Sequence, residues 1–118
     1  MAGKAAYEYI AKAVELALAG RIAAIVTSAI SKEALNAAGY HYAGHTEVLA
    51  DLTGAESVAM MLIGGHMRVS HVSTHCSLRE AIERARRARI LAVIRLTDRA
   101  LRRMGLPNPR IAVAGLNP

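Results

Sequence analysis

The sequence predicts an α/β protein in which helices flank a mixed sheet. Segments with helical spacing of apolar residues alternate with short apolar runs of strand length, which is typical of this class. Apolar residues make up 53% of the chain and are mainly Ala, Ile, Leu and Val, with no Phe or Trp. Such residues suit helices packed on a sheet. With 118 residues, the chain is expected to form a single domain over 1–118.

The first half of the sequence predicts a long helix, a strand and two short helices. Apolar residues recur with helical spacing over 4–19, and Gly20 is expected to end that helix. The next segment, 21–29 (RIAAIVTSA), has the length and composition of a buried strand. Ser31 is placed to cap a short helix, and Thr46 is placed to cap the next one.

A hairpin and a second helical region follow. Two strands within 57–75 are expected to join around Gly64-Gly65. Residues 77–80, SLRE, have the pattern of a capping box, in which the Ser and Glu side chains each bond to the other's backbone N–H. Helix then continues to residue 104, with a break expected near Arg87-Ala88. The last segment, 110–115 (RIAVAG), is a further predicted buried strand.

The net charge of +6 is concentrated in one region. Nine of the twelve arginines lie within 79–103, a distribution that invites a nucleic-acid hypothesis. However, no aromatic residues lie among them to stack on bases, and Glu80, Glu83 and Asp98 interrupt the charge. A solvated helix face or a subunit contact is the preferred interpretation, and no nucleic-acid partner is expected.

Two further features bear on location. No segment reaches the roughly 18 consecutive apolar residues of a membrane span, so no membrane partner is expected. Cys76 is the only cysteine, which excludes an internal disulfide and fits a reducing compartment. We therefore expect a cytoplasmic protein.

The five histidines are the first candidates for chemistry. On a strand, His71, Ser73 and His75 would share one face, and two imidazoles there offer two ligands to a divalent metal. A catalytic metal normally needs a third protein ligand. The alternative is that neither histidine binds a metal, with one of them packed in the core and the other at the end of the strand. His75 directly precedes a predicted helix N-terminus, a common place for functional groups in α/β folds.

A second candidate site lies at 44–47, where the sequence GHTE enters a helix. Free backbone N–H groups and the positive end of the helix dipole favour an anion there, with His45 and Thr46 as possible donors. Lys32, at the start of the preceding helix, is a third candidate for contact with an anion or a hydroxyl group. The alternatives are plain helix capping at Thr46 and a solvated lysine.

Four segments taken together resemble one enzyme family, that of 4-hydroxythreonine-4-phosphate dehydrogenase and its relatives that act on threonate or erythronate 4-phosphate. These segments are VTSAISKEALNAAGYHYAGHTEVLADLTG (26–54), MRVSHVSTHCSLREA (67–81), VIRLTDRALRRMG (93–105) and PRIAVAGLNP (109–118). The resemblance covers essentially the whole sequence and matches the central part of the longer family chains. It implies part of an α/β/α fold like that of isocitrate and isopropylmalate dehydrogenases.

The resemblance also implies a chemistry and its residues. His45 and Thr46 would contact the phosphorylated substrate, and His75 would be the first of three metal-binding histidines. Lys32, which rests on its position at a helix start and not on the resemblance, is kept as a further substrate-binding candidate. The cofactors would be NAD and a divalent metal (zinc, cobalt or magnesium). The family's members are homodimers that oxidise a secondary alcohol and then lose a carboxyl group from the resulting β-keto acid.

By the same resemblance, the other metal histidines and the nicotinamide-binding region lie outside this sequence. We therefore expect a fragment or engineered domain that does not turn over by itself. The alternative is a non-catalytic α/β domain that self-assembles and keeps a residual metal or anion site.

Overall fold

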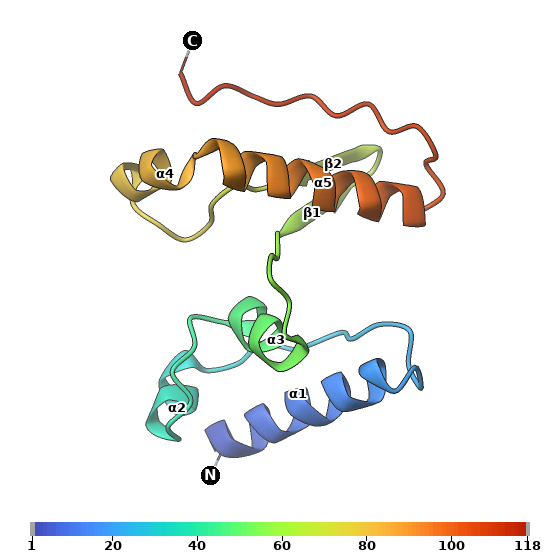
Figure 1. Ribbon diagram of the computed structural model, residues 1–118. Coiled ribbons are helices and arrows are strands. Elements are labelled where there is room, and N and C mark those ends of the chain that lie inside the picture. The colour runs from blue at the N-terminus through green and yellow to red at the C-terminus, as the bar shows by residue number, and fades with distance from the viewer. Residues whose placement is uncertain (1, 118) are drawn as a thin grey trace. The chain divides into compact units, whose positions relative to one another are not determined.

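The protein is described here by a computed structural model that covers residues 2–117 (Figure 1). The chain divides between Glu56 and Ser57 into two compact units, and each is described by itself. The expected organisation of 1–118 as one domain stays a prediction. Among residues 2–117, no helix is both long enough and apolar enough to cross a bilayer.

The first unit contains three helices: α1 (Ala2–Leu18), α2 (Lys32–Ala37) and α3 (His45–Thr53). Helix α1 packs against both of the others. The core is formed by one buried residue or more from each helix, namely Ile10, Val14, Leu35 and Val48. Ile10 and Val14 are four residues apart on α1, so the apolar spacing of that helix supplies the face that the short helices cover.

Gly3 brings α1 and α2 into close contact. It is buried, and a Cβ atom at this position would lie 1.8 Å from the backbone oxygen of Ala34 in α2. Only a residue without a side chain allows the two backbones to approach so closely. No sequence pattern distinguishes this glycine from the others.

The predicted strand at 21–29 is wrong for the described structure. Residues 24–30 are extended but pair with no strand, and the Val26 side chain is 97% exposed. The regular elements among residues 2–56 are helices, so these residues present no sheet edge to accept the backbone hydrogen bonds of a strand. Composition favours a strand, but pairing requires a partner.

The second unit begins with an antiparallel hairpin formed by β1 (Met61–Gly64) and β2 (Met67–Ser70). Gly64 pairs with Met67, so the turn consists of Gly65 and His66, one residue later than predicted. Gly65 has φ 53°, a left-handed conformation at the first turn position that glycine adopts at low cost.

Two helices follow the hairpin: α4 (Leu78–Arg84) and α5 (Arg87–Arg103). The predicted break is confirmed, and it falls at Ala85 and Arg86. On α5 the buried residues Val93, Thr97 and Leu101 are spaced by four, as expected for an amphipathic helix.

The predicted strand at 110–115 is also wrong, because these residues are extended without a paired neighbour. The sheet of the described residues therefore consists of the hairpin alone. Helices and a sheet in one chain confirm the α/β class.

Candidate functional site

The N-terminus of α3 differs from the prediction in its cap. His45 is the first residue of the helix and Gly44 is its N-cap, so Thr46 lies inside the first turn and is not the cap. Glycine has no side chain to accept a hydrogen bond, and no side-chain cap is formed. The first backbone N–H groups of α3 thus remain available to an external acceptor.

His45 adds a second polar group at this helix end. Its side chain is half-buried, and its Nε2 atom is buried without a hydrogen-bond partner among the described residues. A buried polar atom without a partner is costly. A bound group that offers a donor or an acceptor to Nε2 would remove that cost.

Lys32 occupies the first position of α2. Ser31 caps this helix as predicted, because its Oγ accepts a hydrogen bond from the N–H of Ala34 at 3.2 Å. Lys32 itself is exposed. The structure therefore leaves its ammonium group accessible to an anion or to solvent.

Three stacked tyrosines hold the loop that leads into α3. Tyr7 of α1 stacks on Tyr40 with ring centroids 3.8 Å apart, and Tyr42 lies nearly parallel at 6.3 Å from Tyr7. The Tyr42 hydroxyl donates to Asp51 Oδ2 of α3 at 2.5 Å. This hydrogen bond to a carboxylate is the main reason that the pKa of Tyr42 is raised from 10.0 to about 12.

The tyrosine cluster was not predicted. Its sequence signal was the placement of two of the four tyrosines, Tyr40 and Tyr42, just before GHTE. The cluster joins α1, the 40–42 loop and α3, and so it fixes where the open end of α3 lies within the first unit.

His75 lies in the second unit, in the loop between β2 and α4. Strand β2 ends at Ser70, so the predicted strand that would align His71, Ser73 and His75 on one face is wrong. His75 is exposed and has φ 49°, the only left-handed φ of a non-glycine residue among residues 2–117. Backbone strain of this kind gathers at functional sites.

His71 begins this loop and is half-buried. Its backbone N–H donates to the Met60 oxygen at 3.0 Å, which extends the hairpin by one bond. Its Nε2 atom is buried and has no hydrogen-bond partner among the described residues. His71 and His75 thus differ in environment, the first enclosed and the second open to solvent.

The residues present do not make a complete metal centre. Within residues 2–117, no three His, Cys, Asp or Glu side chains are grouped so that they could hold an ion. An exposed imidazole such as His75 can supply one ligand. The site assignments for His75, and for His45, Thr46 and Lys32 in the other unit, remain predictions.

The loop that carries His75 ends in the predicted capping box, which is confirmed. Ser77 Oγ accepts from the Glu80 N–H at 3.3 Å, and Glu80 Oε2 accepts from the Ser77 N–H at 2.9 Å. The hydrogen bonds from Ser77 lower the pKa of Glu80, with a smaller contribution from Arg84. The start of α4 is therefore defined by local bonds on the C-terminal side of His75.

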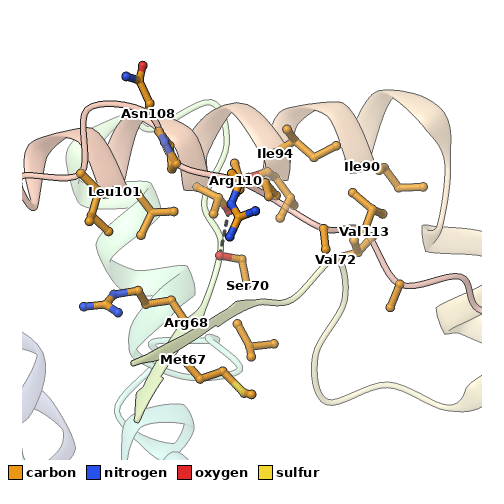
Figure 2. A pocket seen from close by; sticks show the side chains of 18 of the residues that line it. Met67, Arg68, Ser70, Val72, Ile90, Ile94, Leu101, Asn108, Arg110 and Val113 are labelled. Carbon is orange, nitrogen blue, oxygen red and sulfur yellow. Dashed lines mark hydrogen bonds between the residues drawn. The ribbon is translucent and has the colours of Figure 1, made fainter. Parts of the chain in front are cut away.

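An apolar groove of about 950 Å³ lies in the second unit between β2, α5 and the extended C-terminal segment (Figure 2). Val72, Ile94 and Val113 are among the side chains that line it. Across one wall, the Thr97 and Ser70 hydroxyl oxygens lie 2.8 Å apart and are hydrogen-bonded. No local sequence pattern indicates this groove, because it is formed by residues far apart in the chain.

Comparisons with known proteins find relatives of this α/β chain that are named as dehydrogenases. The chain is 49% identical over 117 residues to D-threonate 4-phosphate dehydrogenase of Pectobacterium atrosepticum, with 99% of this chain and 36% of the relative covered. It is 51% identical over 118 residues to 4-hydroxythreonine-4-phosphate dehydrogenase of Beijerinckia indica, with 100% and 35% covered.

A solved structure agrees with these relatives. The crystal structure of 4-hydroxythreonine-4-phosphate dehydrogenase from Klebsiella pneumoniae matches with a TM-score of 0.92 and 49% identity, over 98% of this chain and 36% of that chain. The model of the family described as pyridoxal phosphate biosynthetic protein PdxA matches residues 1–118. The chain belongs to this family, and it spans about a third of the length of the relatives. The predicted resemblance is thus confirmed.

Proposed function

We propose that this chain is part of an NAD-dependent dehydrogenase that oxidises a four-carbon hydroxy acid carrying a 4-phosphate, such as 4-hydroxythreonine 4-phosphate. Membership of the PdxA family and relatives that are dehydrogenases of phosphorylated hydroxy acids support this proposal. Because the chain spans about a third of those relatives, the activity is proposed for the whole protein and not for these 118 residues alone.

The observation that carries the proposal is the open N-terminus of α3. A helix that begins without a side-chain cap offers backbone N–H groups and a positive dipole end to a phosphate. His45 stands at this helix end with an unpartnered Nε2 atom, and Thr46 follows in the first turn. We assign both to the substrate phosphate end, with Lys32 as an additional cationic contact.

The proposed reaction removes a hydride from the secondary alcohol and a proton from its hydroxyl group. NAD, when bound, would supply the hydride acceptor. The resulting β-keto acid would then lose its carboxyl group as carbon dioxide, and the enolate left behind would take up a proton at carbon. The part that this chain's residues play is to bind and orient the phosphorylated end, which keeps the distant reacting carbon in place. A position for the nicotinamide is not assigned within the described residues.

A divalent metal (zinc, cobalt or magnesium) is the second proposed cofactor. His75 would supply one imidazole ligand because it is exposed and lies two residues before Ser77, the N-cap of α4. The described residues lack the remaining ligands, so no catalytic step is assigned to the metal here. For the whole protein, we also propose a homodimer in the cytoplasm, the compartment being supported by the single cysteine.

Calorimetric titration tests the phosphate assignment. D-threonate 4-phosphate should bind more tightly than D-threonate, and His45→Ala should weaken binding of the phosphorylated acid about 10- to 100-fold, as expected for a lost hydrogen bond to a charged group. His41→Ala, which alters an exposed histidine in the loop before α3, is the matched control and should bind as the parent does. Equal affinity for the two acids would refute the assignment.

We expect no turnover from the 118-residue chain. Hydride transfer needs a positioned cofactor, and the described residues do not complete the metal shell. The measurement is NADH formation with D-threonate 4-phosphate, NAD and cobalt. Sustained NADH formation by the purified chain would contradict this expectation.

One observation favours a second candidate function, that of a non-catalytic domain that self-assembles. Large apolar side chains are exposed in both units, including Val26 at 97% and Met67 at 70%. Exposed apolar surface and unpaired extended segments promote association. Under this alternative, the α3 end and His75 would be a residual anion site and a residual metal site.

A further inference from the structure

The loop between β2 and α4 is fixed at both ends but has a strained centre. At its start, the His71 N–H donates to the Met60 oxygen, and at its end Ser77 forms the capping box of α4. Between these points, His75 has a left-handed φ of 49°. Few non-glycine residues adopt this conformation, and surrounding contacts are needed to offset its cost.

Arg89, in the first turn of α5, reaches back to this loop. Its Nε donates to the Val72 oxygen at 3.0 Å, and its Nη1 donates to Ser57 Oγ at 3.3 Å. Val72 lies three residues before His75, whereas Ser57 lies in the segment that leads into β1. The half-buried guanidinium group thus ties α5 to both chain segments that flank the hairpin.

These contacts indicate that Arg89 positions the chain segments it bonds to and does not pair with a charged group. Both acceptors are neutral oxygens, and one of them is a backbone carbonyl, whose place depends on the path of the loop. The planar guanidinium group donates in two fixed directions, so it restrains the carbonyl more tightly than a flexible side chain would. Removing it would leave the Val72 carbonyl without this donor.

We propose that Arg89 is a positioning residue that holds the 72–76 loop at Val72 and thereby sets the left-handed backbone and the direction of His75. The functional part of this inference, that the direction matters for metal binding, rests on the proposed role of His75. The conformational part does not depend on that role, and the two are tested by separate measurements.

Nuclear magnetic resonance tests the conformational part. Arg89→Met removes both donors, Arg89→Lys keeps the charge and one donor group, and Arg99→Met alters an exposed arginine of the same helix. The chemical shifts and H–N–Cα–H coupling of His75 report its φ. Arg89→Met should move them away from left-handed values, Arg89→Lys should restore them in part, and Arg99→Met should leave them unchanged.

Thr97→Val separates positioning from general loss of stability. Thr97 is hydrogen-bonded to Ser70, so this variant weakens a different contact between α5 and the hairpin. It should lower the melting temperature without changing the His75 signals. Unchanged His75 signals in Arg89→Met, or equal changes in Thr97→Val and Arg89→Met, would overturn the proposal.

Cobalt titration, followed by calorimetry, tests the functional part. If the parent chain binds cobalt and His75→Ala abolishes binding, Arg89→Met should weaken it about 10-fold, and Arg99→Met should not. Cobalt affinity of Arg89→Met equal to that of the parent would overturn the functional part. A parent chain that binds no cobalt would overturn the functional part as stated for these 118 residues, while the His75 signals would still decide whether Arg89 positions the loop.

Discussion

At the scale of single residues, the hydrogen bond between Tyr42 and Asp51 joins the loop before α3 to the helix itself. The carboxylate of Asp51 stabilises the protonated phenol, which raises the pKa of Tyr42 to about 12. Because the folded pKa lies above the ordinary value of 10.0, this contribution to stability is complete below pH 10 and is lost as the pH rises through about 12. The first unit is thus expected to weaken in strong alkali.

Ultraviolet absorbance of tyrosinate measures this effect. One tyrosine of the parent chain should ionise near pH 12, and Asp51→Asn should lower that midpoint towards 10, because the hydrogen bond to a carboxylate is lost together with its negative charge. Asp98→Asn, which alters a carboxylate paired with Arg102 in the second unit, is the matched control and should leave the curve unchanged. Identical curves for the parent and Asp51→Asn would contradict the assignment.

At the scale of elements, α1 and α2 meet through backbone contact at Gly3. Alanine is a better helix former than glycine by about 1 kcal/mol, so helix propensity alone predicts that Gly3→Ala stabilises the protein. Packing predicts the opposite, because the added Cβ would lie 1.8 Å from the Ala34 oxygen. We expect packing to dominate, since backbone atoms of a neighbouring helix cannot move aside cheaply.

Chemical denaturation distinguishes these two effects. Gly3→Ala should reduce the free energy of unfolding of the first unit by about 1–3 kcal/mol, the usual cost of overpacking. Gly64→Ala is the matched control, because a Cβ there meets no atom within 4 Å. An increase in stability for Gly3→Ala would show that α1 and α2 do not approach as described.

At the scale of the whole molecule, the main feature is uncovered apolar surface. Each unit exposes large apolar side chains, and the extended segments 24–30 and 110–115 have no paired strand. Burying apolar surface is worth about 25 cal/mol per Å², so this surface favours association with another protein chain. A second copy of this chain is the partner that our proposal of a homodimer names.

Sedimentation measures the predicted association. The parent chain should form dimers or larger species, and a double variant, Val26→Ser with Met67→Ser, should shift the distribution towards monomer because it removes two of the most exposed apolar side chains. Replacing two exposed polar residues, Glu8→Ser with Arg103→Ser, provides the control and should have little effect. A parent chain that stays monomeric at high concentration would contradict this prediction.

The sequence by itself determined the features that depend on neighbouring residues. Ser31 and Ser77 cap their helices as predicted, because each bond joins residues three positions apart. The segments containing GHTE and STHC also identified the family, since a run of consecutive residues can be compared with the family's sequences without knowledge of the fold. Only the tertiary structure decided that 21–29 and 110–115 remain unpaired, that β2 ends before His71, and that Gly44 caps α3. Strand pairing, the close approach at Gly3 and the reach of Arg89 to Val72 depend on residues distant in the chain, whose meeting no local pattern encodes.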